Sequence, residues 1–139
     1  MDLSEYGITR NEIEGSLNYA IVTIVIGIGV ITALGTTLGF KDVAFDWVWI
    51  ILYASVSVPL QEFIFRGVLQ KALYRIGTAR AIFITSAVYG LIHYPDPLLI
   101  VLTFAAGLAW GYSYYKHPNL LGPVISHAVL GLFLFLLVL

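Results

Sequence analysis

PLQEFIFRG, residues 59–67, decides the fold of this chain, because it places an acid and a guanidinium inside a long apolar run. Ionisable side chains are costly within a membrane-spanning segment and by default mark a functional site. Glu62 and Arg66 stand four residues apart, on one face of a helix, so Arg66 is the expected partner of Glu62. Gln61 is turned about 100° around the helix from Glu62 and, as an amide, can form hydrogen bonds but cannot act as a base.

The composition indicates an integral membrane protein. Of the 139 residues, 60% are hydrophobic and 11% are charged, and the mean hydropathy is +0.93. Soluble domains carry about 25% charged residues, so most of this surface is expected to contact the lipid bilayer rather than water. A net charge of −1 argues against a nucleic-acid partner, which would require a basic patch. The absence of cysteine excludes disulfides, thiolate nucleophiles and cysteine metal sites.

The apolar runs predict an all-α fold: a polytopic membrane helix bundle of about five transmembrane helices, in a single domain of residues 1–139. The expected helices cover residues 17–38, 47–74, 81–93, 98–115 and 121–139. The polar segment 1–16 lacks the basic region of a secretory signal and is expected to form a short helix at the membrane interface. Pro59 predicts a kink in the second helix, and the third helix is short for a full crossing.

Positive charge lies mainly on one side of this arrangement. Lys41 falls on one side, and five other basic residues fall on the opposite side: Arg10, Lys71, Arg75, Arg80 and Lys116. The positive-inside rule then predicts an integral, multi-pass membrane protein with its N-terminus in the cytoplasm and its C-terminus outside.

His93 and His127 each stand alone on an otherwise apolar helix. Either one by itself has an ordinary explanation, a hydrogen bond to a carbonyl that locks two helices together. Two histidines and Glu62 on three separate helices favour convergence instead, because polar groups buried in lipid must pair with one another. The predicted helix boundaries argue against this convergence in one respect. They put His93 near the outer end of its helix and His127 nearer the cytoplasmic end, so convergence needs a tilted or re-entrant third helix.

Three spaced motifs carry a resemblance to a known family. They are QEFIFR at 61–66, YGLIH at 89–93 and HAVLG at 127–131. From about residue 47 to the end, the sequence resembles the CPBP intramembrane proteases of the Abi type, which include CAAX prenyl endopeptidases and bacteriocin-associated proteins. The family motifs are two glutamates followed by three residues and Arg, an aromatic followed by three residues and His, and His followed by three residues and Asn or Asp.

The resemblance implies a glutamic-type protease that works inside the membrane. In the family, the first Glu and the second-motif His activate a water, while the last His and the Asn stabilise the oxyanion. The second Glu and the Arg of the first motif look like scaffold in the family. Our candidate catalytic residues are Glu62, His93 and His127. The supporting residues are Gln61, Arg66 and Gly131.

The sequence departs from the family pattern at two working positions. Gln61 stands where the base is expected, and Gly131 stands where the oxyanion-hole Asn is expected. Loss of one oxyanion donor costs about 10²–10³ in rate. Glu62 is a poor substitute base, because recruiting it swings the carboxylate about 100° around the helix and leaves Arg66 unpaired. A Glu→Gln change introduced at 61 to trap an inactive enzyme would explain Gln61 but not Gly131.

A metal site is a competing interpretation, because Glu62, His93 and His127 make a His₂Glu set that zinc accepts. No H-E-x-x-H motif is present, and the charge of Arg66 beside Glu62 opposes a cation. We therefore expect neither a metal nor a cofactor.

Three functions remain open from the sequence. We favour a family relative with impaired catalysis that acts as a binding or scaffold subunit for a membrane protein or membrane peptide. The alternative is an active intramembrane endopeptidase of the CAAX-protease type. In the third, the polar residues only hold helices together.

Overall fold

The computed structural model describes residues 2–43 and 45–138, and it confirms the all-α prediction, since no strand occurs among these residues. The helices are α1 (Ile13–Leu38), α2 (Trp47–Leu52), α3 (Val58–Glu62), α4 (Lys71–Leu73), α5 (Thr78–Leu91), α6 (Pro97–Lys116) and α7 (Leu121–Leu137), with a 3₁₀ turn at Leu3–Tyr6. Two π-helical segments, Tyr53–Ser57 and Phe63–Gln70, join α2, α3 and α4. Together with a final 3₁₀ turn they make one long helix, Trp47–Ile76.

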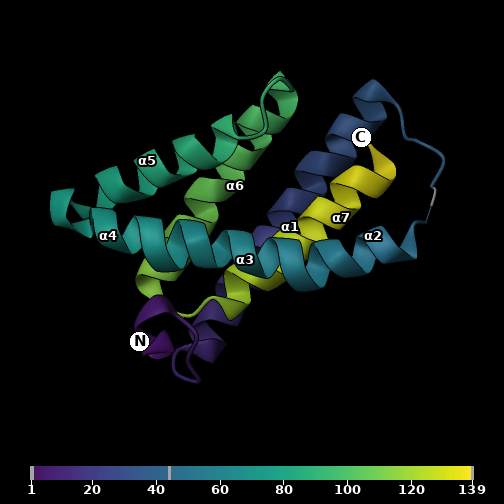
Figure 1. Cartoon of the computed structure of the whole chain (residues 1–139). Helices are drawn as coiled ribbons and strands as arrows, with labels where there is room; N and C mark the ends of the chain where they lie inside the picture. Colours follow the sequence, from purple (N-terminus) through teal and green to yellow (C-terminus); the bar gives the residue numbers. More distant parts are fainter. Residues whose placement is uncertain (1, 44, 139) are drawn as a thin grey trace.

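The long helix crosses two pairs of helices (Figure 1). In one pair, α5 and α6 form an antiparallel hairpin, and in the other α1 and α7 run side by side in the same direction. The parallel direction is fixed at both ends, because Ser16 meets Gly122 at the start of the two helices and Lys41 N–H donates to the Leu137 carbonyl at their ends. The long helix contacts α5 through Phe63–Gln70 and α7 through α3.

The long helix begins and ends at residues suited to those positions. The Asp46 carboxylate caps its start by accepting from the Trp49 N–H at 3.0 Å. Gly77, with φ +106°, ends it, because L side chains rarely adopt that backbone conformation. Pro59, predicted to kink this helix, lies within α3 between the two π-helical segments. The helix is continuous through the proline, and its irregularity takes the form of π-helical turns, which frequently occur at functional sites.

Three predicted boundaries were wrong by a few residues. The first helix begins at Ile13 rather than 17, because Ser16 is buried there and its hydroxyl donates to the Asn119 carbonyl. The third begins at Thr78 rather than 81. It ends at Leu91, which leaves His93 in the turn before α6.

The polar segment 1–16 does not form the single interfacial helix expected of it. After the short turn at Leu3–Tyr6, the chain is tied to the rest of the fold by Asn119, whose side-chain amide donates to the carbonyls of Thr9 and Asn11 at 2.8 and 2.7 Å. These hydrogen bonds join segments far apart in the chain, so no local sequence pattern predicts them.

The α5–α6 hairpin is held by small residues. A Cβ on Gly90 would come within 2.9 Å of the Ile100 carbonyl oxygen, and one on Gly107 within 3.1 Å of the Ser86 Cβ. Glycine at these positions lets the two helices approach closely, as small residues do in membrane bundles.

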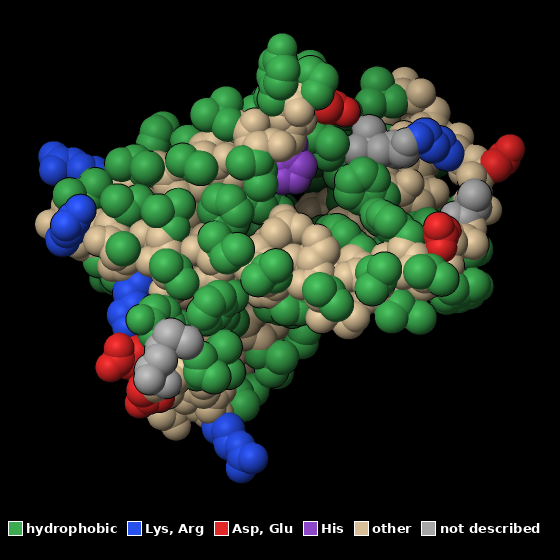
Figure 2. Space-filling model, in the orientation of Figure 1, with side chains coloured by type: hydrophobic (Ala, Val, Ile, Leu, Met, Phe, Trp, Pro, Cys, Tyr) green, Lys and Arg blue, Asp and Glu red, His purple; other side chains and the backbone are tan. Residues whose placement is uncertain are grey.

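The surface is that of a membrane protein. Figure 2 shows hydrophobic side chains over nearly the whole visible face, with charged side chains at its margins. Among the described residues, Ile13–Leu38, Trp47–Ile76 and Pro97–Lys116 are long and apolar enough to cross a bilayer, while α5 and α7 are apolar but shorter.

We expect Gly122→Ala to lower the thermal unfolding temperature in detergent, because a Cβ at 122 would overlap the Ser16 carbonyl oxygen and separate α1 from α7. Gly29→Ala is the matched control, since nothing lies within 4 Å of a Cβ there and alanine is the better helix former. Equal unfolding temperatures for the two variants would contradict this view of the α1–α7 contact.

Candidate active site

Glu62 and Arg66 form a buried ion pair at the π-helical turn of the long helix. Their side chains are 1% and 0% exposed, and Arg66 Nε lies 3.3 Å from Glu62 Oε2. The angle of this contact is not that of a hydrogen bond, so the attraction is mainly Coulombic. Arg66 Nη2 donates to the Gly107 carbonyl at 3.3 Å, and the guanidinium lies 5.2 Å from the Tyr89 ring centre. The expected pairing of these two residues is present.

The other Glu62 oxygen binds His127. His127 Nδ1 lies 2.7 Å from Glu62 Oε1, and His127 Nε2 lies 3.0 Å from the Tyr89 hydroxyl. An ionised carboxylate can only accept, so Nδ1 carries a proton, and in the neutral ring Nε2 accepts from the Tyr89 O–H. The structure therefore brings together Glu62 on α3 and His127 on α7, 65 residues apart.

Gln61 takes part in the same network as an amide. Its Nε2 donates to the Ser57 hydroxyl at 2.8 Å, and its Oε1 lies 3.3 Å from the Tyr89 hydroxyl. The Tyr89 hydroxyl has one proton, which the nearer His127 nitrogen and the Gln61 oxygen must share. Gln61 thus accepts at the position where the family pattern has a base.

His93 is close to this network but not bonded to Glu62. Its Nδ1 is 2.9 Å from the Tyr89 carbonyl, the ordinary bond of a histidine four residues along. Its ring centre lies 5.2 Å from that of Tyr89. His93 and His127 nonetheless line one cavity, which Glu62 does not line.

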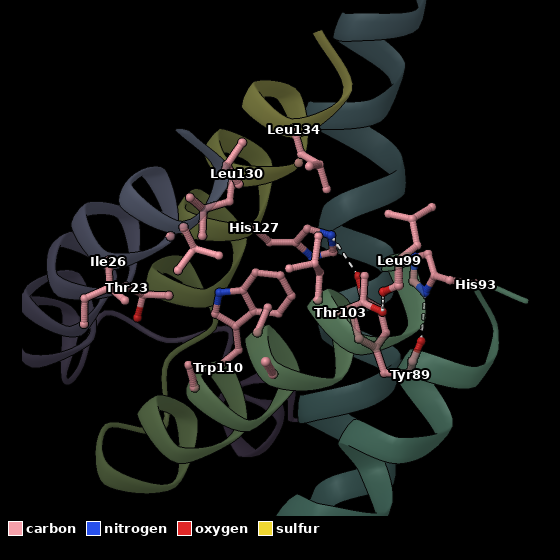
Figure 3. A pocket seen from close by; sticks show the side chains of 18 of the residues that line it. Thr23, Ile26, Tyr89, His93, Leu99, Thr103, Trp110, His127, Leu130 and Leu134 are labelled. Atoms are coloured by element: carbon pink, nitrogen blue, oxygen red, sulfur yellow. Dashed lines mark hydrogen bonds between the residues drawn. The ribbon is translucent and has the colours of Figure 1, made fainter. Parts of the chain in front are cut away.

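The cavity, of about 390 Å³, lies between α1 and the α6 and α7 helices. Figure 3 shows His127, Tyr89, His93 and Trp110 at its wall. The Trp110 and His127 rings are stacked, with centres 4.4 Å apart. Apolar side chains make most of the remaining lining, among them Val22, Ile26, Leu99, Leu102, Leu130 and Leu134. Among the described residues that line it there is no carboxylate, lysine or arginine.

Gly131 faces the hydroxyl of Tyr53. A Cβ added at 131 would overlap that oxygen and lie 2.8 Å from the Tyr53 Cζ. A larger side chain at 131, such as that of asparagine, would therefore displace Tyr53. Glycine at this position and tyrosine at 53 are complementary in shape.

A family model described as "Type II CAAX prenyl endopeptidase Rce1-like" matches residues 43–133. The chain belongs to the Rce1-like family. No curated protein and no solved structure matches it. The matched range includes all three motifs, from Gln61 to Gly131, and confirms the resemblance to CAAX-type intramembrane proteases. With its apolar helices, this Rce1-like chain is a membrane protein of the intramembrane-protease type.

Sequence reasoning missed three side chains of the Rce1-like site. Tyr89 was noted only as the aromatic of the second motif, and its hydroxyl links Gln61 with His127. Tyr53 and Trp110 drew no attention, because aromatic residues are ordinary in apolar helices. A tyrosine or tryptophan away from the headgroup level does carry a signal, since its polar atom needs a partner there.

Among the described residues, no group of three or more potential metal ligands lies close enough to hold an ion. Glu62 is already engaged by Arg66 and His127.

Arg66→Met is expected to destabilise the protein by about 3–5 kcal/mol, because it leaves the Glu62 carboxylate buried without its cation. Adding Glu62→Gln should recover part of this loss, because the double variant removes both charges. Glu5→Ala is the control: it breaks the exposed pair with Lys71, 3.5 Å apart, which is worth about 0–1 kcal/mol. Denaturant titrations in mixed micelles measure all three. Similar losses of unfolding free energy for Glu5→Ala and Arg66→Met would contradict the claim that burial makes the Glu62 charge depend on Arg66.

Proposed function

We propose that this Rce1-like protein binds a membrane-embedded peptide or protein segment without cleaving it, as a binding or scaffold subunit. One observation carries the proposal: the cavity reaches both histidines, but no carboxylate lines it among the described residues. A glutamic-type protease needs a base beside the attacking water. Here Gln61 holds that position as an amide bonded to Ser57 and near Tyr89.

Glu62 does not supply the missing base. Its carboxylate is 1% exposed, and its two oxygens face Arg66 and His127. Turning it toward the cavity would break both contacts and leave the Arg66 charge buried alone, at a cost of several kcal/mol. Glu62 therefore has a structural role, in which its bond with His127 holds the long helix against α7.

The cavity is the part of the site that would bind a ligand. A cavity of about 390 Å³ is within the size range of small-ligand sites, and its lining is mainly apolar. An apolar peptide segment or a prenyl chain could enter it with a gain in hydrophobic contact, whereas water has few polar partners there. A membrane peptide is therefore the ligand that the cavity favours.

The second candidate is an active endopeptidase, and the Glu62–His127 contact of 2.7 Å favours it. A carboxylate that orients a histidine is the arrangement by which many hydrolases prepare a general base. In this structure, however, His127 Nε2 is occupied by the Tyr89 hydroxyl, 3.0 Å away. Proteolysis would require that bond to open.

A peptidase assay separates the two candidates. We expect the purified wild-type protein to bind a farnesylated CAAX-type peptide in detergent and to release no product detectable by mass spectrometry. Cleavage that is lost in His127→Ala would overturn the proposal. The triple variant Gln61→Glu, Gly131→Asn, Tyr53→Ala is the gain-of-activity comparison. It restores both family residues and removes the ring that the larger side chain at 131 would otherwise meet.

We also propose that the N-terminus lies in the cytoplasm, as the charge asymmetry indicates. The chain has no cysteine, so single cysteines report orientation without background. In intact cells, a membrane-impermeant maleimide should label Asp42→Cys and leave Ser4→Cys unlabelled until the membrane is opened. Both positions are exposed, so access is set by the side of the membrane. The reverse pattern of labelling would place the N-terminus outside.

A further inference from the structure

We propose that the cavity holds one acyl chain of an anionic phospholipid, with the lipid phosphate beside Lys116 at the end of the cavity where α6 ends. The proposal goes beyond the proposed function, because it concerns a lipid that occupies the cavity whether or not the chain binds or cleaves a peptide. It rests on three features of the cavity: a sideways opening, a narrow section and unlike charges at its two ends.

The cavity is open to the side between α1 and α6. Val22 and Ile26 line it from α1 and are 57% and 63% exposed, and Ala105 lines it from α6 and is also exposed. In Figure 3, Ile26 lies on the α1 side of the cavity and Trp110 on the α6 side. Both helices are long and apolar enough to cross the bilayer, so the opening faces hydrocarbon rather than water. Lipid chains are as apolar as this lining and enter it without loss of hydrogen bonds.

The cavity is long and narrow. On α6 its lining runs from Leu99 to Tyr112, which is about 20 Å at a rise of about 1.5 Å per residue. Divided by that length, the volume of about 390 Å³ gives a mean cross-section of about 20 Å². A helix with its side chains is about 10–12 Å across, or roughly 80–110 Å² in section. A transmembrane helix therefore does not fit, whereas one extended hydrocarbon chain does, and the cavity is longer than the roughly 15 Å of hydrocarbon in one leaflet.

The end of the cavity near Tyr112 carries a positive charge. Tyr19 on α1 and Tyr112 on α6 line this end, with ring centres 5.9 Å apart. Lys116 Nζ lies 5.7 Å from the centre of the Tyr112 ring, and it forms no ion pair with any residue that the structure describes. The Glu12 carboxylate is already bound by His117 Nδ1 at 2.7 Å. The Lys116 ammonium is therefore free to pair with the phosphate of a lipid whose chain lies in the cavity.

The opposite end of the cavity carries a negative charge. Leu99 lines the cavity there, and its N–H donates to the Asp96 carboxylate at 3.0 Å. A phosphate at this end would be repelled by that carboxylate. The unlike ends therefore set the direction of the lipid, with its head at Lys116 and its chain running toward Leu99. The proposed orientation puts Lys116 in the cytoplasm, so the lipid belongs to the inner leaflet, where anionic lipids attract basic residues.

Trp110 reports whether a lipid chain is in the cavity. The chain has three tryptophans, and Trp47→Phe with Trp49→Phe leaves Trp110 as the sole indole. Trp110 is 3% exposed and lines the cavity, so lipids on the outer surface of the bundle touch little of it. Bromine on an acyl chain quenches an indole only at close range. The full-length protein with these two changes is placed in nanodiscs of dioleoylphosphatidylcholine that contain increasing mole fractions of brominated phosphatidylcholine or brominated phosphatidylglycerol.

We expect both brominated lipids to quench Trp110, with half-maximal quenching at about a fivefold lower mole fraction for phosphatidylglycerol at low salt. Added salt should reduce this preference, because the pair of Lys116 with the phosphate lies at the water boundary. Lys116→Gln should make the two lipids equal. Lys71→Gln is the matched control and should keep the preference, because Lys71 is bound to Glu5 and does not lie at the cavity. Equal quenching before the change, or a preference that survives Lys116→Gln, overturns the placement of the phosphate.

Ala106→Phe tests the acyl chain, because Ala106 lines the cavity and a phenyl ring there takes up its space. We expect quenching by both lipids to be largely lost, while Ala33→Phe, at an exposed position of α1 outside the lining, leaves it unchanged. Ala109→Phe repeats the test at a second lining position, and unfolding temperatures show which variants keep the fold. Absence of quenching before these changes, or equal quenching in the lining variants and Ala33→Phe, overturns the proposal. Cleavage of the farnesylated peptide would overturn the proposed function alone, because the quenching experiment contains no peptide.

Discussion

The fold depends on one carboxylate, that of Glu62, which is buried among the helices with only 1% of its surface exposed. Arg66 supplies the opposite charge from the next helical turn, and His127 supplies a hydrogen bond from the last helix. A buried charge is tolerated only when it is paired and hydrogen-bonded, so these contacts constrain where α7 can lie against the long helix. The cation in turn binds the Gly107 carbonyl and draws in α6. One acid thus links helices from three parts of the chain.

The contacts that bury Glu62 also affect which polar groups are present around the cavity. Glu62 is buried with its two oxygens facing Arg66 and His127, and Gln61 beside it is an uncharged amide bonded to Ser57. What remains around the cavity is a set of hydrogen-bonding rings, those of Tyr53, Tyr89 and Trp110, in an apolar lining. We propose that such a site binds a membrane-embedded segment without cleaving it.

Much of the framework was predictable because hydrocarbon restricts the chain so strongly. Every backbone amide must be satisfied within the segment, which makes apolar runs of this length helical, and the long helix was placed to within two residues of its end. The pairing of Glu62 with Arg66 followed from their spacing alone. The start of the first helix near residue 13 was missed, because the contact of Ser16 with Asn119 is a tertiary bond between distant segments.

By itself, the sequence determined the all-α membrane fold, the family motifs and the ion pair, because these follow from composition and from spacing along one helix. The tertiary structure decided which groups meet across helices. It bonded His127 to Glu62, left His93 on the cavity wall, and set Tyr53 over Gly131. Those contacts depend on how π-helical turns rotate the long helix and how closely glycine lets its neighbours approach, and local pattern does not encode either.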